Sequence, residues 1–260
     1  MYSYTELLDI IKVLRSEKGC AWDRKQTHES LMPHLLEESY ELVDAIKKED
    51  APNMKEELGD ILLQVLMHAE IASEKGEFTM EDIVDGIASK LVYRHPHVFE
   101  EDNKLSAEEV EANWEQLKKA EKKQSTQTEA MESIAKSLPA LTRAQKIVKK
   151  AEEVGFLWDS YEPVVDKIKE ELEEVLVEVK KQDNIKIEEE IGDLLFSVVN
   201  LAYILQINPE FALTNCMEKF INRFRYIENS TFQAGKQLSQ LTLSEMDRLW
   251  EECKNVRPND

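Results

Sequence analysis

Hydrophobic residues recur at helical spacing along most of the chain, most clearly in its second half. Between residues 163 and 181 the apolar positions are Ile168, Leu172, Val175 and Val179. Between residues 185 and 206 they are Ile187, Ile191, Leu194, Leu195 and Val198. Recurrence every three to four residues is typical of an amphipathic helix with one buried face. We therefore predict two helices whose apolar stripes are buried.

The rest of the pattern and the composition favour an all-α class. In the second half we expect helices over about 131–153, 163–181, 185–206, 209–230 and 242–254. Gly and Pro number only seven each among 260 residues, which is few for a protein rich in tight turns. A hydrophobic fraction of 42% is enough for a substantial core.

An internal repeat organises the chain. Gly19, Trp22 and Asp23 correspond to Gly155, Trp158 and Asp159, which lie 136 residues later. Glu56, Glu57, Gly59 and Asp60 correspond to Glu189, Glu190, Gly192 and Asp193, which lie 133 residues later. Further matches in the same order are Lys90 with Lys219, Arg94 with Arg223, and Trp114 with Trp250. An ordered set of matches with small changes of offset indicates one duplicated domain.

A polar segment separates the two copies. Residues 117–130 are charged, then rich in Ser, Thr and Gln, and have no apolar period. We predict two tandem helical-bundle domains, an N-terminal one over 1–120 and a C-terminal one over 131–260, joined by a linker over 121–130.

Carboxylates gather on one flank of the two amphipathic helices. At about 100° per residue Glu171 and Glu174 share a side of the first helix, and Glu190 and Asp193 share a side of the second. Glu174 lies eight residues before Gln182, the centre of the intervening turn, and Glu190 lies eight after it. Residues equally far from the turn of an antiparallel pair are level, so we predict that these carboxylates face one another.

The first half has the same arrangement. Glu41 and Glu57 lie eight residues either side of Glu49, with Glu38 and Asp60 one turn away. Carboxylates held together raise each other's pKa unless cations neutralise them, and oxygen ligands of this kind suit Mg²⁺, with Mn²⁺ as a substitute. Glu38, Glu41, Glu57 and Asp60 are therefore candidates for a second metal site. A di-iron bundle would need Glu-x-x-His motifs, which the sequence lacks.

The doubled pattern resembles a known family. Glu37-Glu38-x-x-Glu41 followed by Glu57-x-x-Asp60, and Glu170-Glu171-x-x-Glu174 followed by Glu190-x-x-Asp193, are similar to the signature of the MazG nucleoside triphosphate pyrophosphohydrolases. The YRHPHVF stretch at 93–99 and the tryptophans Trp114 and Trp250 agree with it. The resemblance implies an all-α NTP pyrophosphatase fold, a homodimer, and Mg²⁺-dependent cleavage of NTPs, ATP included, to NMP and diphosphate. It also implies a role in clearing or controlling nucleotide pools.

The resemblance assigns roles to the matched residues. Glu171, Glu174, Glu190 and Asp193 would hold Mg²⁺, which would bridge the phosphates and activate a water for attack on the α-phosphorus. Glu170 or Glu189 would accept the proton from that water, a choice left open here. The expected substrate-binding residues are Lys167, Lys186, Glu189, Lys219, Arg223 and Trp250. Trp250 could equally be a core residue that anchors the last helix.

The two halves differ at positions that would neutralise phosphate charge. His34 stands where Lys167 would be, and Asn53 stands where Lys186 would be. We therefore expect catalysis in the C-terminal domain, with the degenerate N-terminal site serving dimerisation, regulation, or a weaker and narrower catalysis. The alternative is a helical dimer that binds Mg²⁺ or nucleotide as a sensor or partner-binding module without turnover. A metal-binding scaffold alone has no need of cations beside its carboxylates, so the two lysines favour the enzyme.

The net charge, the cysteines and the N-terminal sequence limit the kinds of partner and the cellular location that we expect. A formal charge of −20 argues against nucleic-acid binding, because phosphate backbones are held by basic surfaces. Three widely spaced cysteines, Cys20, Cys216 and Cys253, predict no disulfide framework. The N-terminus has no basic start followed by an apolar run, and the most apolar segment, 194–207, is too short to span a bilayer. We expect a cytoplasmic protein without membrane contact.

Overall fold

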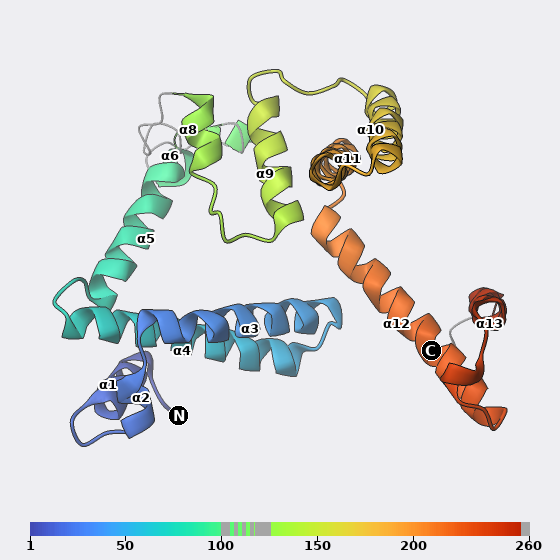
Figure 1. The fold of residues 1–260 in the computed structure, drawn as a ribbon. Coiled ribbons are helices and arrows are strands. Elements are labelled where there is room, and N and C mark those ends of the chain that lie inside the picture. Colours follow the sequence, from blue (N-terminus) through green and yellow to red (C-terminus); the bar gives the residue numbers. More distant parts are fainter. Residues whose placement is uncertain (100–104, 107–108, 111–112, 115–116, 118–125, 256–260) are drawn as a thin grey trace. The chain divides into compact units, whose positions relative to one another are not determined.

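The computed structural model describes residues 1–99, 105–106, 109–110, 113–114, 117 and 126–255 (Figure 1). The regular elements of these residues are all helices, which confirms the all-α prediction. The chain divides into two compact units, Met1–Glu121 and Lys122–Asp260. Residues 121–125 of the expected linker lie outside the described residues, and a helix begins at Gln127 within its remainder.

The first unit is built around a pair of long antiparallel helices. Its helices are α1 (Tyr4–Arg15), α2 (Ala21–Lys25), α3 (His28–Lys47), α4 (Ala51–Glu74), α5 (Met80–Arg94) and α6 (Pro96–Phe99). Figure 1 shows α3 and α4 side by side, with α1 packed against α4. The core of this unit consists of Ile11, Leu31, Leu66, Met67 and Ile71.

The second unit repeats this helical pair. Its helices are α8 (Gln127–Glu132), α9 (Ala140–Glu152), α10 (Glu162–Lys181), α11 (Asn184–Ile204), α12 (Pro209–Gln233), the 3₁₀ turn η1 (Leu238–Gln240) and α13 (Leu243–Asn255). Here α10 packs along α11, while α9 contacts α11 and α12, and α13 packs on α12. Four of the five helices expected in this half are present within about three residues of the predicted ends.

The fifth expected helix, 131–153, is wrong as a continuous element. The structure divides it into α8 and α9, with residues 133–139 between them. Pro139 occupies the N-cap position of α9. Proline has no N–H to donate and disfavours the helical conformation of the residue before it, so a helix cannot run through this point at low cost.

The turns of the two helical pairs lie where the repeat predicts them. Glu49 and Gln182 both adopt left-handed backbone conformations, with φ of 54° and 59°. The next residue in each case, Asp50 or Asp183, is the N-cap of the second helix, and its side chain accepts a hydrogen bond from a backbone N–H of the first turn. These caps set the start of α4 and α11, and with it the register of the carboxylates.

The expectation that the apolar stripes are buried is wrong for the single chain. Leu172 on α10 is 48% exposed and Leu195 on α11 is 52% exposed. Exposed with them are Leu176, Val179, Ile191 and Val198. The buried residues of α10 and α11 include Val164 and Val199, and also four polar ones: Glu171, Glu178, Ser197 and Asn200. The pair of helices α10 and α11 therefore presents an apolar surface outward.

Within the part of the chain that the structure describes, no single helix is long and apolar enough to cross a membrane. The helices α11 and α12 meet the criterion of length and composition only when they are taken together across a bend of 105°.

Candidate active site

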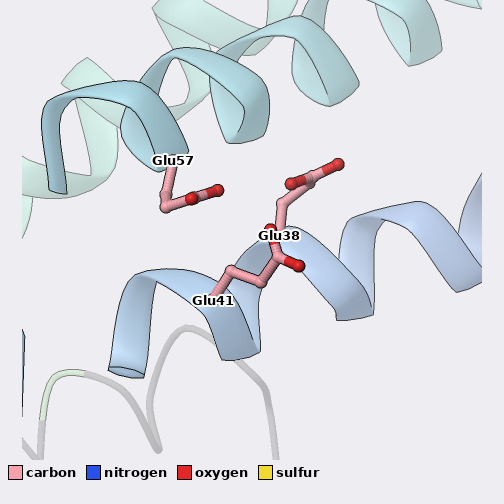
Figure 2. Close-up of side chains that lie close together, drawn as sticks. All are labelled: Glu38, Glu41 and Glu57. Atoms are coloured by element: carbon pink, nitrogen blue, oxygen red, sulfur yellow. The ribbon is translucent and has the colours of Figure 1, made fainter. Parts of the chain in front are cut away.

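Each helical pair brings three carboxylates together. In the second unit they are Glu171 and Glu174 of α10 and Glu190 of α11, whose nearest ligand oxygens all lie within 4.8 Å of one another. We call them the C-terminal cluster. In the first unit Glu38 and Glu41 of α3 meet Glu57 of α4 within the same limit, as Figure 2 shows. We call these the N-terminal cluster.

The register of the helices accounts for both clusters. Residues at i and i+3 share a helix face, which places Glu171 beside Glu174 and Glu38 beside Glu41. The single acid from the second helix of each pair is level with them across the turn. The predicted meeting of carboxylates across each helical pair is thus confirmed for three of the four acids in each half.

Because Glu171 is buried, the negative charge of the C-terminal cluster destabilises the fold unless a cation lies beside it. Glu171 is only 4% exposed, and its Oε2 atom is buried without a hydrogen-bond partner in the part of the chain that the structure describes. The other oxygen, Oε1, accepts an ion-pair contact of 2.8 Å from Nζ of Lys167. A buried carboxylate oxygen with nothing to bind is destabilising, so the position is suited to a cation.

Lys167 supplies one positive charge at the edge of this cluster. Its ammonium group lies 2.8 Å from a carboxylate oxygen of Glu170 and 2.8 Å from one of Glu171. Hydrogen bonds to Glu170 and Glu171, in that order of importance, raise the pKa of Lys167. The lysine is therefore a permanent cation between an exposed and a buried acid.

The crowding of negative charge raises pKa values in both clusters. Desolvation, followed by the charges of Glu171 and Glu190, raises the pKa of Glu174, and Lys167 opposes this. In the N-terminal cluster burial raises the pKa of Glu57, with Glu41 the largest charged contributor. Burial also raises the pKa of Glu38, with Asp60 as its strongest charged neighbour.

In the metal-free protein we expect the stability contributed by Glu174 to fall as pH rises. Its pKa in the folded state is raised above the ordinary value of 4.5. The folded state then holds the proton more tightly than the unfolded state, so the contribution is complete below pH 4.5 and is lost as pH rises through the folded pKa. The melting temperatures of wild type and Glu174→Gln, measured in chelator at several pH values up to about 8, test this.

Relative to the variant, wild type should lose stability with increasing pH, and added Mg²⁺ should reverse the loss at high pH. If the melting temperatures of the two proteins changed with pH in parallel, both with and without Mg²⁺, the expectation would be contradicted.

Several predicted site residues lie outside the clusters. Asp193 follows Glu190 by one turn and is exposed, and its carboxylate is not among the three that meet. Glu189 and Lys186 are also exposed on α11. Glu170 is exposed and accepts the hydrogen bond from Lys167. These residues surround the cluster without completing it.

The remaining predicted substrate residues lie on α12 and α13. Arg223 places its guanidinium carbon 5.2 Å from the ring centroid of Trp250, and Phe220 lies 5.1 Å from the same ring. Lys219, one turn before Arg223, is exposed. Within the described part of this unit α12 contacts α9, α11 and α13 but makes no extended contact with α10, which carries Glu171 and Glu174.

The first unit contains the matching pair. Arg94 lies 5.5 Å from the ring centroid of Trp114. The repeat relates Arg94 to Arg223 and Trp114 to Trp250, so both copies pack the tryptophan under an arginine. This shared contact gives both tryptophans a packing role.

Glu178 is a buried acid that the sequence reasoning left out of the site. It is 7% exposed, its Oε1 accepts a hydrogen bond of 2.6 Å from Lys181, and its Oε2 is buried with no hydrogen-bond partner among the residues described. It follows Glu171 by seven residues and Glu174 by four, so it shares their helix face, and that spacing was the available signal. The repeat places Ala45 at this position in the first half.

The residues present fit a hard divalent cation. The C-terminal cluster offers three carboxylates from two helices, and the unpartnered Oε2 of Glu171 lies buried among them. Carboxylate oxygens of this kind are the ligands that Mg²⁺ takes in proteins, usually with several waters or phosphate oxygens completing the octahedron.

Comparison with known proteins identifies one family model and several similar proteins. The family model described as the MazG nucleotide pyrophosphohydrolase domain matches twice, over residues 26–99 and 159–227. A protein of Escherichia coli strain K12 named nucleoside triphosphate pyrophosphohydrolase is 44% identical, over 98% of each chain. A nucleoside triphosphate pyrophosphohydrolase/pyrophosphatase of Thermotoga maritima is 45% identical, over 96% of this chain and 95% of its own. The crystal structure of a MazG-related protein from Thermotoga maritima aligns with a TM-score of 0.39 and 36% identity, over 44% of this chain and 98% of that one.

Proposed function

The chain belongs to the MazG nucleotide pyrophosphohydrolase family, and we propose on this premise that it converts nucleoside triphosphates and water to nucleoside monophosphates and diphosphate. The observation that carries the proposal is the C-terminal cluster, where three carboxylates meet across α10 and α11 with one buried oxygen unpartnered. Clearing of unwanted nucleotides in the cytoplasm is the proposed role.

The proposed metal ligands are the C-terminal cluster together with Asp193. Mg²⁺, or Mn²⁺ in its place, would supply charge neutralisation at the phosphates and a more acidic bound water. Asp193 lies three residues after Glu190, so it can join the cluster by a rotation of its side chain. The N-terminal cluster with Asp60 is the proposed second metal site.

Residues of this chain would orient the substrate and move the proton. Lys167 holds its charge at the edge of the cluster, where a phosphate oxygen could replace Glu170 as its partner. Glu170 and Glu189 are both exposed and are the two proposed acceptors of the proton from water. Lys186, Lys219 and Arg223 are proposed to bind phosphate oxygens, and Trp250 the nucleoside.

Diphosphate release from a panel of ribo- and deoxynucleoside triphosphates tests the function. We expect release by the full-length protein with Mg²⁺ and none when a chelator removes the metal. Equimolar monophosphate and diphosphate should form, since the bond cleaved joins the α- and β-phosphates. Orthophosphate as the first product, or nucleotide binding without release, would contradict the proposal.

We further propose that the protein is a homodimer whose interface includes the outward apolar stripe of α10 and α11. Leu172, Leu176, Val179, Ile191, Leu195 and Val198 are all exposed in the single chain. An apolar surface of this extent on two adjacent helices is typical of an interaction site, and covering it with a second copy removes it from water.

Leu195→Glu is expected to dissociate this dimer. Burying an unpaired carboxylate costs several kcal/mol, which corresponds to a dissociation constant raised by roughly 100-fold or more. Light scattering at micromolar protein concentration would show the particle mass falling from that of two chains to that of one chain. Leu243→Glu, at an exposed position of α13, is the matched control and should leave the mass unchanged. A dimer that persists in Leu195→Glu would place the interface elsewhere.

A further inference from the structure

Two histidines join the start of α3 to α4 in the first unit. His28 is the first residue of α3, and His68 lies on α4. Their Nδ1 atoms are 2.7 Å apart, which is hydrogen-bond distance. The ring planes are parallel within 1° and the ring centroids are 5.0 Å apart. That is close to the largest separation that the Nδ1–Nδ1 distance permits, so the rings lie edge to edge with these two nitrogens facing each other.

The bond between the two rings survives one added proton but not two. In the neutral pair one Nδ1 carries a hydrogen and donates it to the lone pair of the other Nδ1. A first added proton goes to Nε2 of the donor ring, which keeps the bond and makes it charge-assisted. A second added proton has no place except the accepting Nδ1. Two N–H groups and two positive charges would then face each other at 2.7 Å, so the bond would break.

The surroundings of His68 oppose that second proton. His68 is partly buried between the helices of the first unit. Burial, followed by the charge of His28, lowers the pKa of His68 below its ordinary value of 6.5. Among the described residues no carboxylate acts against this shift.

The other charged groups of the helices that meet there do not stabilise a doubly protonated pair. They are Arg15 of α1, Glu29 of α3, and Glu74 and Lys75 at the end of α4. Arg15 and Glu74 neutralise each other, because two guanidinium nitrogens each donate a hydrogen bond of 2.7 Å to the carboxylate. The charge of Glu29 interacts with Lys75 and with His28, so it favours a proton on His28 alone.

The second unit has no such pair. The offset of 133 residues places Tyr161 and Leu201 at the positions of His28 and His68. Neither tyrosine nor leucine takes up a proton near neutral pH. The duplicated helical pair therefore folds without histidines here, and the response to acid belongs to the first unit alone.

We propose that the His28–His68 pair is a pH-sensitive latch, which fastens the start of α3 to α4 while it holds at most one added proton and releases it when both rings are protonated. Acid would then loosen the helix that carries Glu38 and Glu41, about three turns further along. The latch is a property of the fold and does not depend on the proposed catalysis.

The stability that the pair contributes should be lost in acid. Because the pKa of His68 is lowered in the folded state, the contribution is complete above pH 6.5 and is lost as pH falls through the folded pKa. His68→Asn places an amide oxygen near the position of Nδ1, where it can accept the bond from His28 at any pH. Between about pH 7.5 and about pH 5 we expect the melting temperature of the full-length wild type to fall by roughly 5 °C more than that of His68→Asn.

Hydrogen exchange locates the loss within the chain. After correction for the intrinsic effect of pH, the amides of residues 31–36 in α3 should lose protection roughly tenfold at about pH 5 in wild type. They should keep it in His68→Asn. The amides of residues 165–170 in α10 are the internal control, because they occupy the corresponding turns of the second unit, and should stay protected at both pH values.

Two further variants separate the latch from other effects of acid. His28→Tyr/His68→Leu copies the second unit, is a second non-titrating variant, and should keep its protection as His68→Asn does. His34→Asn is the matched control, since His34 lies on the same helix with its Nδ1 3.7 Å from Glu37, and it should lose protection as wild type does. Equal protection of residues 31–36 at both pH values in wild type, or the same loss in both non-titrating variants, overturns the proposal.

Discussion

Glu171→Gln is expected to lower the rate of diphosphate release by roughly 10²–10³-fold at saturating Mg²⁺ and nucleotide, since a metal-ligand charge contributes several kcal/mol at the transition state. Glutamine keeps the size of the side chain and removes its charge. The loss should appear mainly in kcat, and Glu171→Gln/Glu174→Gln should leave no measurable turnover.

The buried environment of Glu171 makes this effect large. One oxygen of its buried side chain contacts Lys167, and the other has no hydrogen-bond partner among the described residues. Few waters can replace the lost charge at so enclosed a position. The folded state should tolerate the change, because replacing a buried charge by a neutral amide relieves repulsion with Glu174.

Glu38→Gln is the matched control, since the repeat relates Glu38 to Glu171. We expect it to retain most of the activity of wild type, because we propose that the N-terminal cluster is regulatory or structural. Loss of activity in Glu38→Gln with full activity in Glu171→Gln would move catalysis to the first half. Equal losses of activity in both variants would indicate that the two clusters depend on each other.

The helical pairs and their carboxylates could be predicted from the sequence because local rules determine them. Helical spacing placed Glu171 and Glu174 on one face, and the distance to the turn made Glu190 level with them. The turn itself depends on Asp183, whose side chain caps α11, and on the left-handed Gln182 before it. Each of these features depends on residues within one helix or one pair of consecutive helices.

Other features depend on how separate helices pack together, or on a second molecule that covers the surface. An apolar stripe predicts that something covers it, but the pattern does not say what, and Leu172 and Leu195 are exposed in the single chain. The same limit applies to Glu178, which shares the face of Glu171 and is buried by its position against α11. The packing of Trp250 under Arg223 joins α13 to α12 and has no sequence signal beyond the repeat.

Lys167→Met is expected to lower kcat by roughly 100-fold, as loss of one preorganised stabilising group typically does. In the enzyme the ammonium would stabilise negative charge on the phosphates, and it already lies 2.8 Å from Glu171. The pH dependence should change too. Lys167 lowers the pKa of Glu174, so its removal should raise that pKa and move the acidic limb of the pH–rate profile to higher pH.

Lys167→Arg should recover part of the activity and restore the position of the acidic limb, since it keeps the positive charge. A purely structural role for the lysine would reduce the melting temperature and the activity of both variants without moving that limb.

The first half of the chain offers the reciprocal change. His34→Lys and Asn53→Lys together, in a chain inactivated by Glu171→Gln, restore the two cations that the N-terminal cluster lacks. Diphosphate release by that chain would show that these lysines separate a catalytic cluster from a metal-binding one, and continued inactivity would assign the difference to other residues, with Glu178 in place of Ala45 the first to test.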